Sequence, residues 1–461
     1  MNSTDRPAAD PESAEKRRIP AGYIFAAAIV AVIVLALVGR HLYYRSKINA
    51  ELDAVRKAGF PVTLQELSDY YPVPQGQNAA YIYSYAFSYY VNEPELSPGS
   101  GKAPLPVVGT EKLPPRGEAL PQEMQTAVSA YLTSNAKALD LLHKAAAIEG
   151  CRFDVDWGHG YDARLPHLAN LRQAARLLEL QALMKVEQGK PEEAAAALEA
   201  SFAVAHSLRN EPILMSQLAR IGVNSVSLNA LERVLSRVAL TDKQLTDLSR
   251  RIAAEDTPEP FQRGMAGERC TGHICFLIGI WRGAFQTKGE TVGSKVSAAF
   301  YSLSGMEAQD ELMYLNLMSD AVNNGAGTMK DMRERSIALD KRIAQVPKTC
   351  LLTRMLVPAL PHASEEELKS FARLHAARAG IAVERFRTAN GRLPDSLNEL
   401  VPKWLDAVPA DPFDDKPIRY KKLTKGLVTY SIGADLKDHG GKERDPKDSN
   451  APYDITFIVE R

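Results

Sequence analysis

Two short segments of the chain bring together side chains that can bind metals. In the first, Cys270-Thr-Gly-His273-Ile-Cys275, two thiols flank an imidazole, a combination that suits zinc. A structural zinc site needs a second ligand pair at similar spacing, and the sequence has none. The second segment, 154–162, reads DVDWGHGYD and offers carboxylates and an imidazole, but no other cluster completes a coordination shell. We therefore expect a solvated connector at 154–162 and no zinc site at 270–275.

The redox state of the four cysteines is left open by the sequence. An even number can pair into disulfides in an oxidising compartment, whereas four reduced and buried thiols fit the same spacing equally well. The cysteines are Cys151, Cys270, Cys275 and Cys350.

Familiar catalytic motifs are absent from the sequence. It contains no G-x-S-x-G, Walker A, G-x-G-x-x-G or H-E-x-x-H motif and no paired C-x-x-C, and its nine histidines are scattered singly. A triad can still assemble from distant residues, so a hydrolase with a dispersed active site remains an alternative, which a deep polar pocket with perturbed acidic residues would favour. We expect a protein that is not an enzyme.

The composition is that of a globular protein of two to four domains. Of 461 residues, 45% are hydrophobic and 24% charged, which excludes wholesale disorder. The 56 basic and 56 acidic side chains give a formal net charge of zero, and no long basic patch occurs. Without a positive field to attract phosphates, nucleic acid is not an expected partner.

The apolar segment Ala21–Gly39 is long enough to cross a membrane. It reads AGYIFAAAIVAVIVLALVG, carries no charge, and is bounded by Lys16-Arg17-Arg18 and Arg40-His41. A helix of this length spans about 28 Å, close to the ~30 Å hydrocarbon core. The run exceeds the apolar region of a signal peptide, and residues 36–39 do not form an A-x-A site. The segment therefore predicts an uncleaved anchor whose first partner is the lipid bilayer.

Charge alone orients this anchor weakly. Basic residues lie on both sides of it: Arg6, Lys16, Arg17 and Arg18 before it, and Arg40, Arg45 and Lys47 after it. A short polar tail (1–18), one span (19–39) and a large following body are typical of a protein whose N-terminus stays in the cytoplasm. We expect a single-pass membrane protein with its bulk outside the cytoplasm.

Helices dominate the middle of the chain. We expect juxtamembrane helices over 40–92, a Pro/Gly-rich linker over 93–121, and a helical body over 122–362 that begins with one helix from Pro121 to Gly150. The run ICFLIGIW (274–281) is too short to span a membrane and predicts a core helix.

One helical hairpin stands out within that body. Two helical patterns between 165 and 208 meet at Gly189-Lys190-Pro191, where Gly ends one helix and Pro starts the next. The alanine-rich pattern resembles a tetratricopeptide-type hairpin, although no 34-residue period repeats cleanly. Such packing leaves grooves that suit peptide partners. Thr241-x-x-Gln244 has the pattern of a capping box and predicts a further helix of the same layer.

Three tyrosines at helical spacing mark the segment 77–91. Tyr81, Tyr85 and Tyr89 fall on one helical face. We expect this face to pack in the protein interior, with an aromatic belt at the lipid headgroups or a sugar-stacking platform as alternatives.

The C-terminal part predicts one helix followed by a small sheet. Ser364-x-x-Glu367 has the pattern of a capping box, Asn390-Gly391 ends the helix, and His375 falls in its apolar stripe as an expected core histidine. Three strand-like runs follow at 416–423, 426–433 and 454–460. Apolar residues alternate in the last two, at Val428, Tyr430 and Ile432 and at Ile455, Phe457 and Val459, so one helix can cover one face of an antiparallel sheet.

These C-terminal residues carry a family likeness. The segments are ERFRTANGRLP (384–394), DPF (411–413), KPIRY (416–420), YSIGAD (430–435) and the closing Asp454-Ile455. In order and residue type they resemble the globular part of the major pseudopilin of type II secretion systems. The whole arrangement is also similar to that of large bacterial membrane-anchored proteins with such tails. This likeness implies a location in the bacterial inner membrane and no activity by itself.

The pseudopilin resemblance implies a calcium site in the loop before the last strand. Asp435 and Asp454 match positions whose aspartates bind Ca²⁺ in the family, and a hard cation needs six to eight oxygen ligands. The family has an acidic residue where this chain has Pro452, and Asp438, Asp445 or Asp448 can substitute for it. The alternative is a solvated loop whose acidity is balanced by Lys437, Lys442, Arg444 and Lys447.

The N-terminal end departs from the pseudopilin pattern. Gly22 is followed by Tyr23 rather than Phe, Ala27 stands where the family has glutamate, and over 300 residues separate the span from the matching helix. Prepilin processing is therefore not expected. The expected fold is mainly α: one N-terminal transmembrane helix, a helical-repeat-like body, and a small α+β module (363–461) with a three-stranded antiparallel sheet.

The expected function follows from this organisation. We expect a membrane-anchored scaffold or adaptor that binds a protein partner through its helical body or its C-terminal module. A component of a type II secretion or pilus-type assembly is the first alternative, and the hydrolase is the second.

Overall fold

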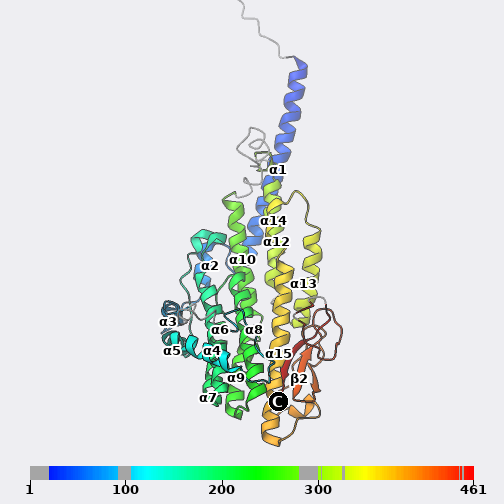
Figure 1. Cartoon of the computed structure of the whole chain (residues 1–461). Helices are drawn as coiled ribbons and strands as arrows, with labels where there is room; N and C mark the ends of the chain where they lie inside the picture. Colours follow the sequence, from blue (N-terminus) through cyan, green and yellow to red (C-terminus); the bar gives the residue numbers. More distant parts are fainter. Residues whose placement is uncertain are drawn as a thin grey trace, which may run out of the picture.

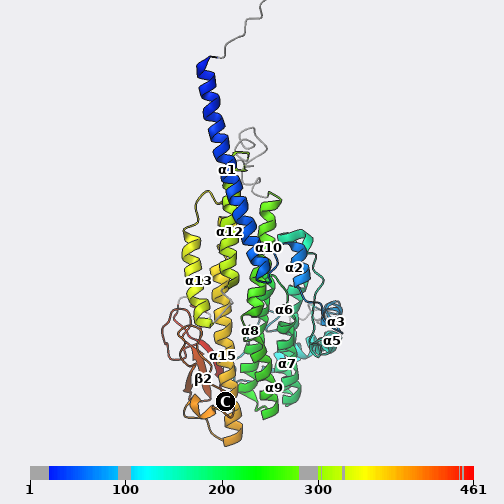
Figure 2. The same cartoon turned by 180° about the vertical axis from the view of Figure 1, so that it is seen from behind.

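A computed structural model describes residues 20–91, 105–279, 299–323, 328–448 and 451–461, apart from 303 and 446. It consists of an elongated helical body from one end of which the long helix α1 projects, while a small sheet lies toward the other end (Figure 1). The view from behind shows the lower half of α1 lying along the body (Figure 2). The mainly helical fold, the single apolar N-terminal helix and the small C-terminal sheet are confirmed.

The elements follow in chain order. The α-helices are α1 (Ala21–Lys57), α2 (Leu64–Tyr70), α3 (Ala79–Phe87), α4 (Gln122–Ser134), α5 (Ala136–Ala146), α6 (Pro166–Glu187), α7 (Pro191–His206), α8 (Leu214–Arg237), α9 (Asp242–Glu255), α10 (Glu259–Leu277), α12 (Met306–Asn323), α13 (Met329–Ala344), α14 (Leu351–Leu356) and α15 (Leu360–Asn390). The short 3₁₀ helices are η1 (Trp157–Asp162) and η3 (Leu397–Leu400), and the strands are β1 (Arg419–Lys422), β2 (Leu427–Ser431) and β3 (Ile455–Val459).

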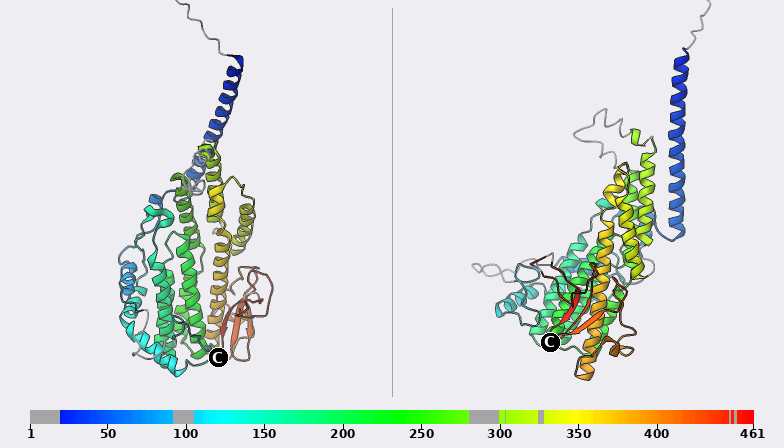
Figure 3. Two further views of the ribbon diagram at one scale, coloured as in Figure 1. Left: turned by 45° about the horizontal axis from the view of Figure 1, so that its top comes forward. Right: turned by 90° about the vertical axis from the view of Figure 1, so that its right-hand side faces the viewer.

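Helix α1 joins the apolar segment to the body without a break. Its first half is exposed, whereas Ile48 and Val55 in its second half are buried. That second half packs along α12, and the side view shows the first half standing clear of the body (Figure 3). The helix ends at Lys57, and Gly59 just beyond it adopts a φ of 82°, which is accessible to glycine at little cost. The first part of the expected juxtamembrane segment, 40–57, is thus the lower part of the same helix, and α2 and α3 form within the rest.

The predicted hairpin is present as α6 and α7. Gly189 adopts a left-handed φ of 67°, and Pro191 occupies the first turn of α7. The two helices pack against each other and against α8, and small buried side chains such as Ala194 and Ala197 allow the close approach. The layer continues through α9, which the expected capping box of Thr241 and Gln244 begins.

The single helix expected between Pro121 and Gly150 is wrong. Two helices, α4 and α5, meet at Asn135. The buried Asn135 amide donates to the carbonyls of Tyr131 and Val91, at 3.0 and 3.2 Å, and its oxygen accepts from the Val91 N–H at 3.0 Å. These tertiary hydrogen bonds fix the break, and helix propensity alone does not reveal them.

The described part of the proline-rich segment crosses the surface of the body. Leu105 and Leu120 are buried, and the carbonyl of Pro114 accepts from Arg233 of α8 at 2.9 Å. Arg116 pairs with Glu443 and lies 3.7 Å from Glu232. Residues 105–121 therefore tie the helical body to the C-terminal region, and 92–104 lie outside the described residues.

Helix α15 begins earlier than its sequence pattern predicts. It starts at Leu360 with Pro361 in the first turn, where the missing proline N–H has no helical partner to lose. Ser364 is therefore inside the helix, its hydroxyl donating to the Leu360 carbonyl at 3.1 Å, and the expected capping box at Ser364 is wrong. The predicted end at Asn390-Gly391 is confirmed by the left-handed φ of 68° at Gly391.

The C-terminal sheet is antiparallel in the order β1-β2-β3, and α15 covers one face of it. In the register, Val428 pairs with Ile458 and Thr429 with Phe457. The Thr429 hydroxyl donates to the Ala376 carbonyl of α15 at 2.7 Å. Because opposite residues share a face, the alternating apolar residues of β2 and of β3 lie on opposite faces.

The loop after β2 covers the other face of this sheet. Gly441 lies against Val428 and Tyr430, and all five residues of β2 are buried as a result. The core is shared with the body, since one continuous hydrophobic cluster runs from Ile48 of α1 to Phe457 of β3. The C-terminal module is therefore built onto α8, α9 and α13 rather than standing apart.

Candidate functional site

The aspartates expected to bind calcium lie in the loop between β2 and β3. Asp454 is buried, and its carboxylate accepts hydrogen bonds from the N–H groups of His439 (3.1 Å) and Gly441 (2.8 Å). Burial, with the nearby charge of Asp438, raises the pKa of Asp454 against the effect of these N–H groups. Asp454 thus closes the loop by accepting from backbone amides.

The other four aspartates do not join Asp454 in a shell of oxygen ligands. Asp435 contacts His439 Nε2 at 2.8 Å, and Asp438 accepts from the Tyr430 hydroxyl at 3.2 Å. Asp445 accepts from the Lys447 N–H at 2.8 Å, and the Asp448 N–H donates to the Asp445 carbonyl. Within the described ranges no group of three or more His, Cys, Asp or Glu is placed to hold a metal. As arranged, these residues do not form the oxygen shell that calcium needs.

The Cys-His-Cys segment lies on α10, and its members have other partners. His273 Nε2 lies 3.0 Å from Glu311 and the Cys270 thiol donates to the Pro61 carbonyl at 3.2 Å. All four cysteines are buried free thiols. Burial raises the pKa of Cys270 to about 12 and the pKa values of Cys275 and Cys350 to about 11, so the reactive thiolate is scarce near neutral pH.

The acidic segment 154–162 forms the connector between α5 and α6. Asp156 accepts from the Gly158 N–H at 3.0 Å and lies 3.3 Å from His159, and both side chains are exposed. Trp157 is buried and packs edge-on against Tyr71. The segment therefore anchors a turn through its tryptophan while its acidic side chains face solvent.

The expected packing of the tyrosine face is wrong. Tyr81 and Tyr85 are exposed on α3, whereas Tyr83 on the opposite face is buried. Helix α3 turns Tyr83 and its small residues toward α5, which leaves the three-tyrosine face outward. Tyr85 and Tyr89 meet edge to face with their hydroxyls 2.7 Å apart. Helix α3 lies on the flank of the body, far from the projecting end of α1, so this face would not reach the headgroups of a bilayer that α1 crosses (Figure 1).

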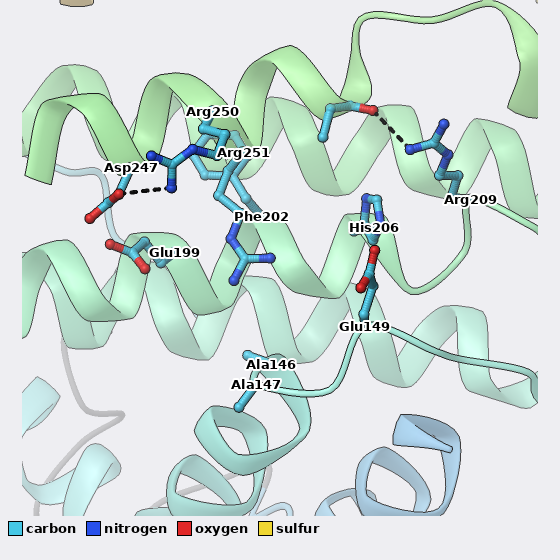
Figure 4. A pocket seen from close by; sticks show the side chains of 11 residues that line it. Ala146, Ala147, Glu149, Glu199, Phe202, His206, Arg209, Asp247, Arg250 and Arg251 are labelled. Atoms are coloured by element: carbon cyan, nitrogen blue, oxygen red, sulfur yellow. Dashed lines mark hydrogen bonds and ion pairs between the residues drawn. The ribbon is translucent and has the colours of Figure 1, made fainter. Parts of the chain in front are cut away.

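A cleft of about 530 Å³ lies where the end of α5 meets α7 and α9 (Figure 4). Its charged lining comprises Glu149, Glu199, His206, Arg209, Asp247, Arg250 and Arg251. Asp247 pairs with Arg250 at 3.0 Å, and Arg209 donates to the Ala254 carbonyl at 3.3 Å. Burial, followed by repulsion from Asp247, raises the pKa of Glu199.

A buried ionic network supports the floor of this cleft. His206 Nδ1 lies 2.8 Å from Glu255, which also accepts from Arg220 at 2.9 Å, and Arg220 reaches Glu367 of α15 at 3.0 Å. Burial acts to raise the pKa of Glu255, but the hydrogen bond with His206 and the charge of Arg220 outweigh it and hold the pKa at about 2. The network fixes the His206 ring at the cleft wall.

The next carboxylate along the chain binds His375. Asp256 lies 2.7 Å from His375 Nε2 and 2.6 Å from Arg378, while His375 Nδ1 lies 2.5 Å from the Ala410 carbonyl. His375 is buried as expected, but it joins a polar network rather than an apolar core. Burial opposes ionisation of Asp256, but its hydrogen bonds and electrostatic contacts with His375 and Arg378 outweigh burial and lower its pKa.

Sequence reasoning missed the network of Arg220, Glu255 and Glu367. In the sequence, the sign of this network is that each charged residue interrupts a helical face that is otherwise apolar or small, as Glu367 does between Ala363 and Phe371. Comparison with family models, curated proteins and solved structures finds no match for this chain.

Proposed function

We propose that this protein is a membrane-anchored scaffold or adaptor whose body works outside the cytoplasm of a bacterial cell. The proposal is carried by α1. An apolar stretch of this helix has high mean hydropathy, and the rest of the described chain buries none of it. Exposing so long an apolar surface to water is unfavourable, and a bilayer of matching thickness covers it.

The anchor is joined rigidly to the body. Arg40 donates to Gln309 at 2.6 Å, Arg45 pairs with Glu311 at 2.8 Å, and Ser319 donates to Glu51 at 2.6 Å. These contacts run along one side of α12 for the length of the shared interface. A rigid junction holds the body at a set distance from the bilayer, which suits a platform for a partner.

Two surfaces of the body suit a protein partner. The Tyr81–Tyr85–Tyr89 face exposes aromatic rings, and tyrosine is enriched where protein partners bind because it buries much area at low entropic cost. The cleft of Figure 4 offers both arginine and carboxylate groups to a peptide of mixed charge. We assign the tyrosine face as the first docking surface.

The pseudopilin likeness adds a narrower proposal. A long helix against a three-stranded antiparallel sheet is the arrangement that the likeness implies for 363–461. A role in a type II secretion or pilus-type assembly rests on this likeness. Calcium binding rests on it too, and would require the loop around Asp454 to rearrange.

The hydrolase alternative has one observation in its favour. The cleft is lined by His206, which Glu255 positions, and, about two turns away along α7, by Glu199, whose pKa is raised by burial. Such groups can exchange protons with a bound water. Among the described lining residues there is no Ser, Thr or Cys, so this chemistry would have no side-chain nucleophile of those types.

Membrane extraction tests the anchor. The full chain should sediment with membranes, resist alkaline carbonate and dissolve only in detergent. Val30→Arg with Ile33→Arg should release it, since each arginine costs about 3 kcal/mol at the centre of a span. The matched control places the same two charges on the exposed body positions Val73 and Ile337 and should stay in the membrane. Wild-type protein in the soluble fraction, or loss of the first forty residues from the mature form, would contradict the proposal.

A C-terminal reporter tests the orientation. Alkaline phosphatase fused after Arg461 should be active, because it folds only outside the cytoplasm. Activity of a cytoplasmic reporter at the same position instead would place the body inside the cell.

A further inference from the structure

Three helices converge at the level where α1 leaves its apolar segment. Arg40, the first residue after that segment, donates to Gln309 near the start of α12 at 2.6 Å. Gly305, just before α12, lies so close to Arg40 and His41 that an added Cβ would stand 3.4 Å from both. The start of α12 is therefore level with the boundary of the apolar segment.

The direction of α12 follows from its contacts with α1. Gln309, Glu311 and Ser319 contact successive positions of α1, in the same order along both helices. The two helices are thus parallel, and the N-terminal end of α12 points toward the span.

Helix α10 runs the other way beside α12, so its C-terminal end reaches the same level. His273 of α10 contacts Glu311 at 3.0 Å, and the Tyr314 hydroxyl donates to the Glu268 carbonyl at 2.8 Å. Residues 277 and 278 follow His273 by about one turn, which places them about 6–7 Å closer to the span. Helix α12 packs along α1, and α10 packs along α12.

Large apolar side chains are exposed at this end. Leu277 and Ile278, expected in a core helix, are 58% and 62% exposed, although the preceding Phe276 is buried. Phe300, one turn before Ser304, is 60% exposed. Met355 of α14 is 69% exposed, and the α14 N-terminus is held by Asp310, whose carboxylate accepts from the Leu352 N–H at 2.9 Å.

We propose that this end of the body is a second membrane-contact surface, which inserts Leu277, Ile278 and Phe300 into the headgroup–acyl boundary beside the span. The inference rests on the proposed anchoring of α1. It commits to lipid because the surface is level with the end of an apolar span that itself has no protein cover. Leu42 and Tyr43, just past Arg40 on α1, are also exposed at this level. Tyrosine is common at the interface between a membrane and water.

Two contacts with one bilayer have a mechanical consequence. A single span can tilt within the bilayer and carry a rigidly joined body with it, whereas a span with a laterally displaced apolar edge has its tilt fixed. The exposed tyrosine face and the cleft of Figure 4 then keep a constant orientation to the membrane.

Depth-dependent fluorescence quenching tests the second contact. The full chain would be labelled with an environment-sensitive dye through Ile278→Cys or Phe300→Cys, one site at a time, and reconstituted into phosphatidylcholine–phosphatidylglycerol vesicles. Brominated lipids should quench both labels by about twofold, as expected for side chains at the headgroup–acyl boundary. A label at Tyr81→Cys, on the exposed face of α3, should not be quenched.

A label within the span separates the two proposals. Quenching at Val32→Cys without quenching at 278 and 300 would overturn the second contact while leaving the anchor intact. No quenching at Val32→Cys would overturn the anchor itself. Labels at 278 and 300 that are shielded from aqueous iodide but not quenched by brominated lipid would show that protein, such as a second copy, covers this end, and would also overturn the proposal.

Discussion

Replacing Glu232 by glutamine should stabilise the protein above neutral pH. Glu232 lies on α8 under the edge of β3, where its carboxylate accepts from the Ile458 N–H at 2.8 Å. Burial raises its pKa to about 7 from the ordinary 4.5, although Arg116 and Arg373 act in the opposite direction. The site therefore favours the neutral carboxylic acid. Glutamine keeps the acceptor for Ile458 and has no proton to lose.

The size and sign of the effect follow from the pKa shift. Between pH 4.5 and 7 the folded chain holds a proton on Glu232 that the unfolded chain has released, so the free energy of unfolding falls as pH rises through this window. Raising the pKa of Glu232 from 4.5 to about 7 corresponds to about 3 kcal/mol in the free energy of unfolding. The stability of Glu232→Gln minus that of wild type should therefore rise by about 3 kcal/mol from pH 4.5 to 7 and stay level at higher pH.

Urea unfolding of the full chain in detergent, followed by circular dichroism across this pH range, measures the difference. Glu443→Gln is the matched control, because Glu443 also pairs with Arg116 but its side chain is 51% exposed. An exposed pair contributes under about 1 kcal/mol, so the control should show no comparable rise. A stability difference for Glu232→Gln that does not change with pH would refute the assignment of a neutral buried carboxyl.

Three further outcomes are expected. Gly380→Ala should lower the free energy of unfolding in urea by about 1–3 kcal/mol, because the added methyl overlaps the buried ring of Phe457. The control Gly222→Ala, at a helical glycine with open space around it, should raise it by about 0.5–1 kcal/mol. Equal effects of the two substitutions would contradict the packing of α15 on the sheet. Asp454→Ala should lower the melting temperature in the presence of chelator, because it removes hydrogen bonds to two backbone amides that contribute about 2 kcal/mol. A melting temperature that falls only in millimolar calcium would instead favour calcium binding by Asp454. All four cysteines should react with a thiol reagent only after denaturation, without prior reduction; fewer than four reactive thiols would reveal a disulfide.

The elements that local rules specify were predictable from sequence. The turn at Gly189 and Pro191, the helix end at Gly391 and the capping box at Thr241 depend on residues within a few positions of each other, and all three are confirmed. The break at Asn135 was not predictable, because the hydrogen bonds that hold it come from Val91, far away in the chain.

The polar sites were the least predictable feature. Arg220 meets Glu367 across 147 positions of sequence, and only the packing of α8 against α15 brings them together. The tyrosine spacing at 81, 85 and 89 correctly implies one face of a helix, but which face turns to solvent is decided by the neighbouring α5.

What the sequence determined by itself is therefore the one-dimensional order: an apolar segment long enough to cross a bilayer, helices with their ends, and a terminal three-stranded sheet. Periodicity and capping are local, so they can be read along the chain. Only the tertiary structure decided that α1 packs along α12, that Arg220 pairs with Glu367 across two helices, and that Leu277, Ile278 and Phe300 are exposed. Contacts between distant segments depend on how whole helices pack.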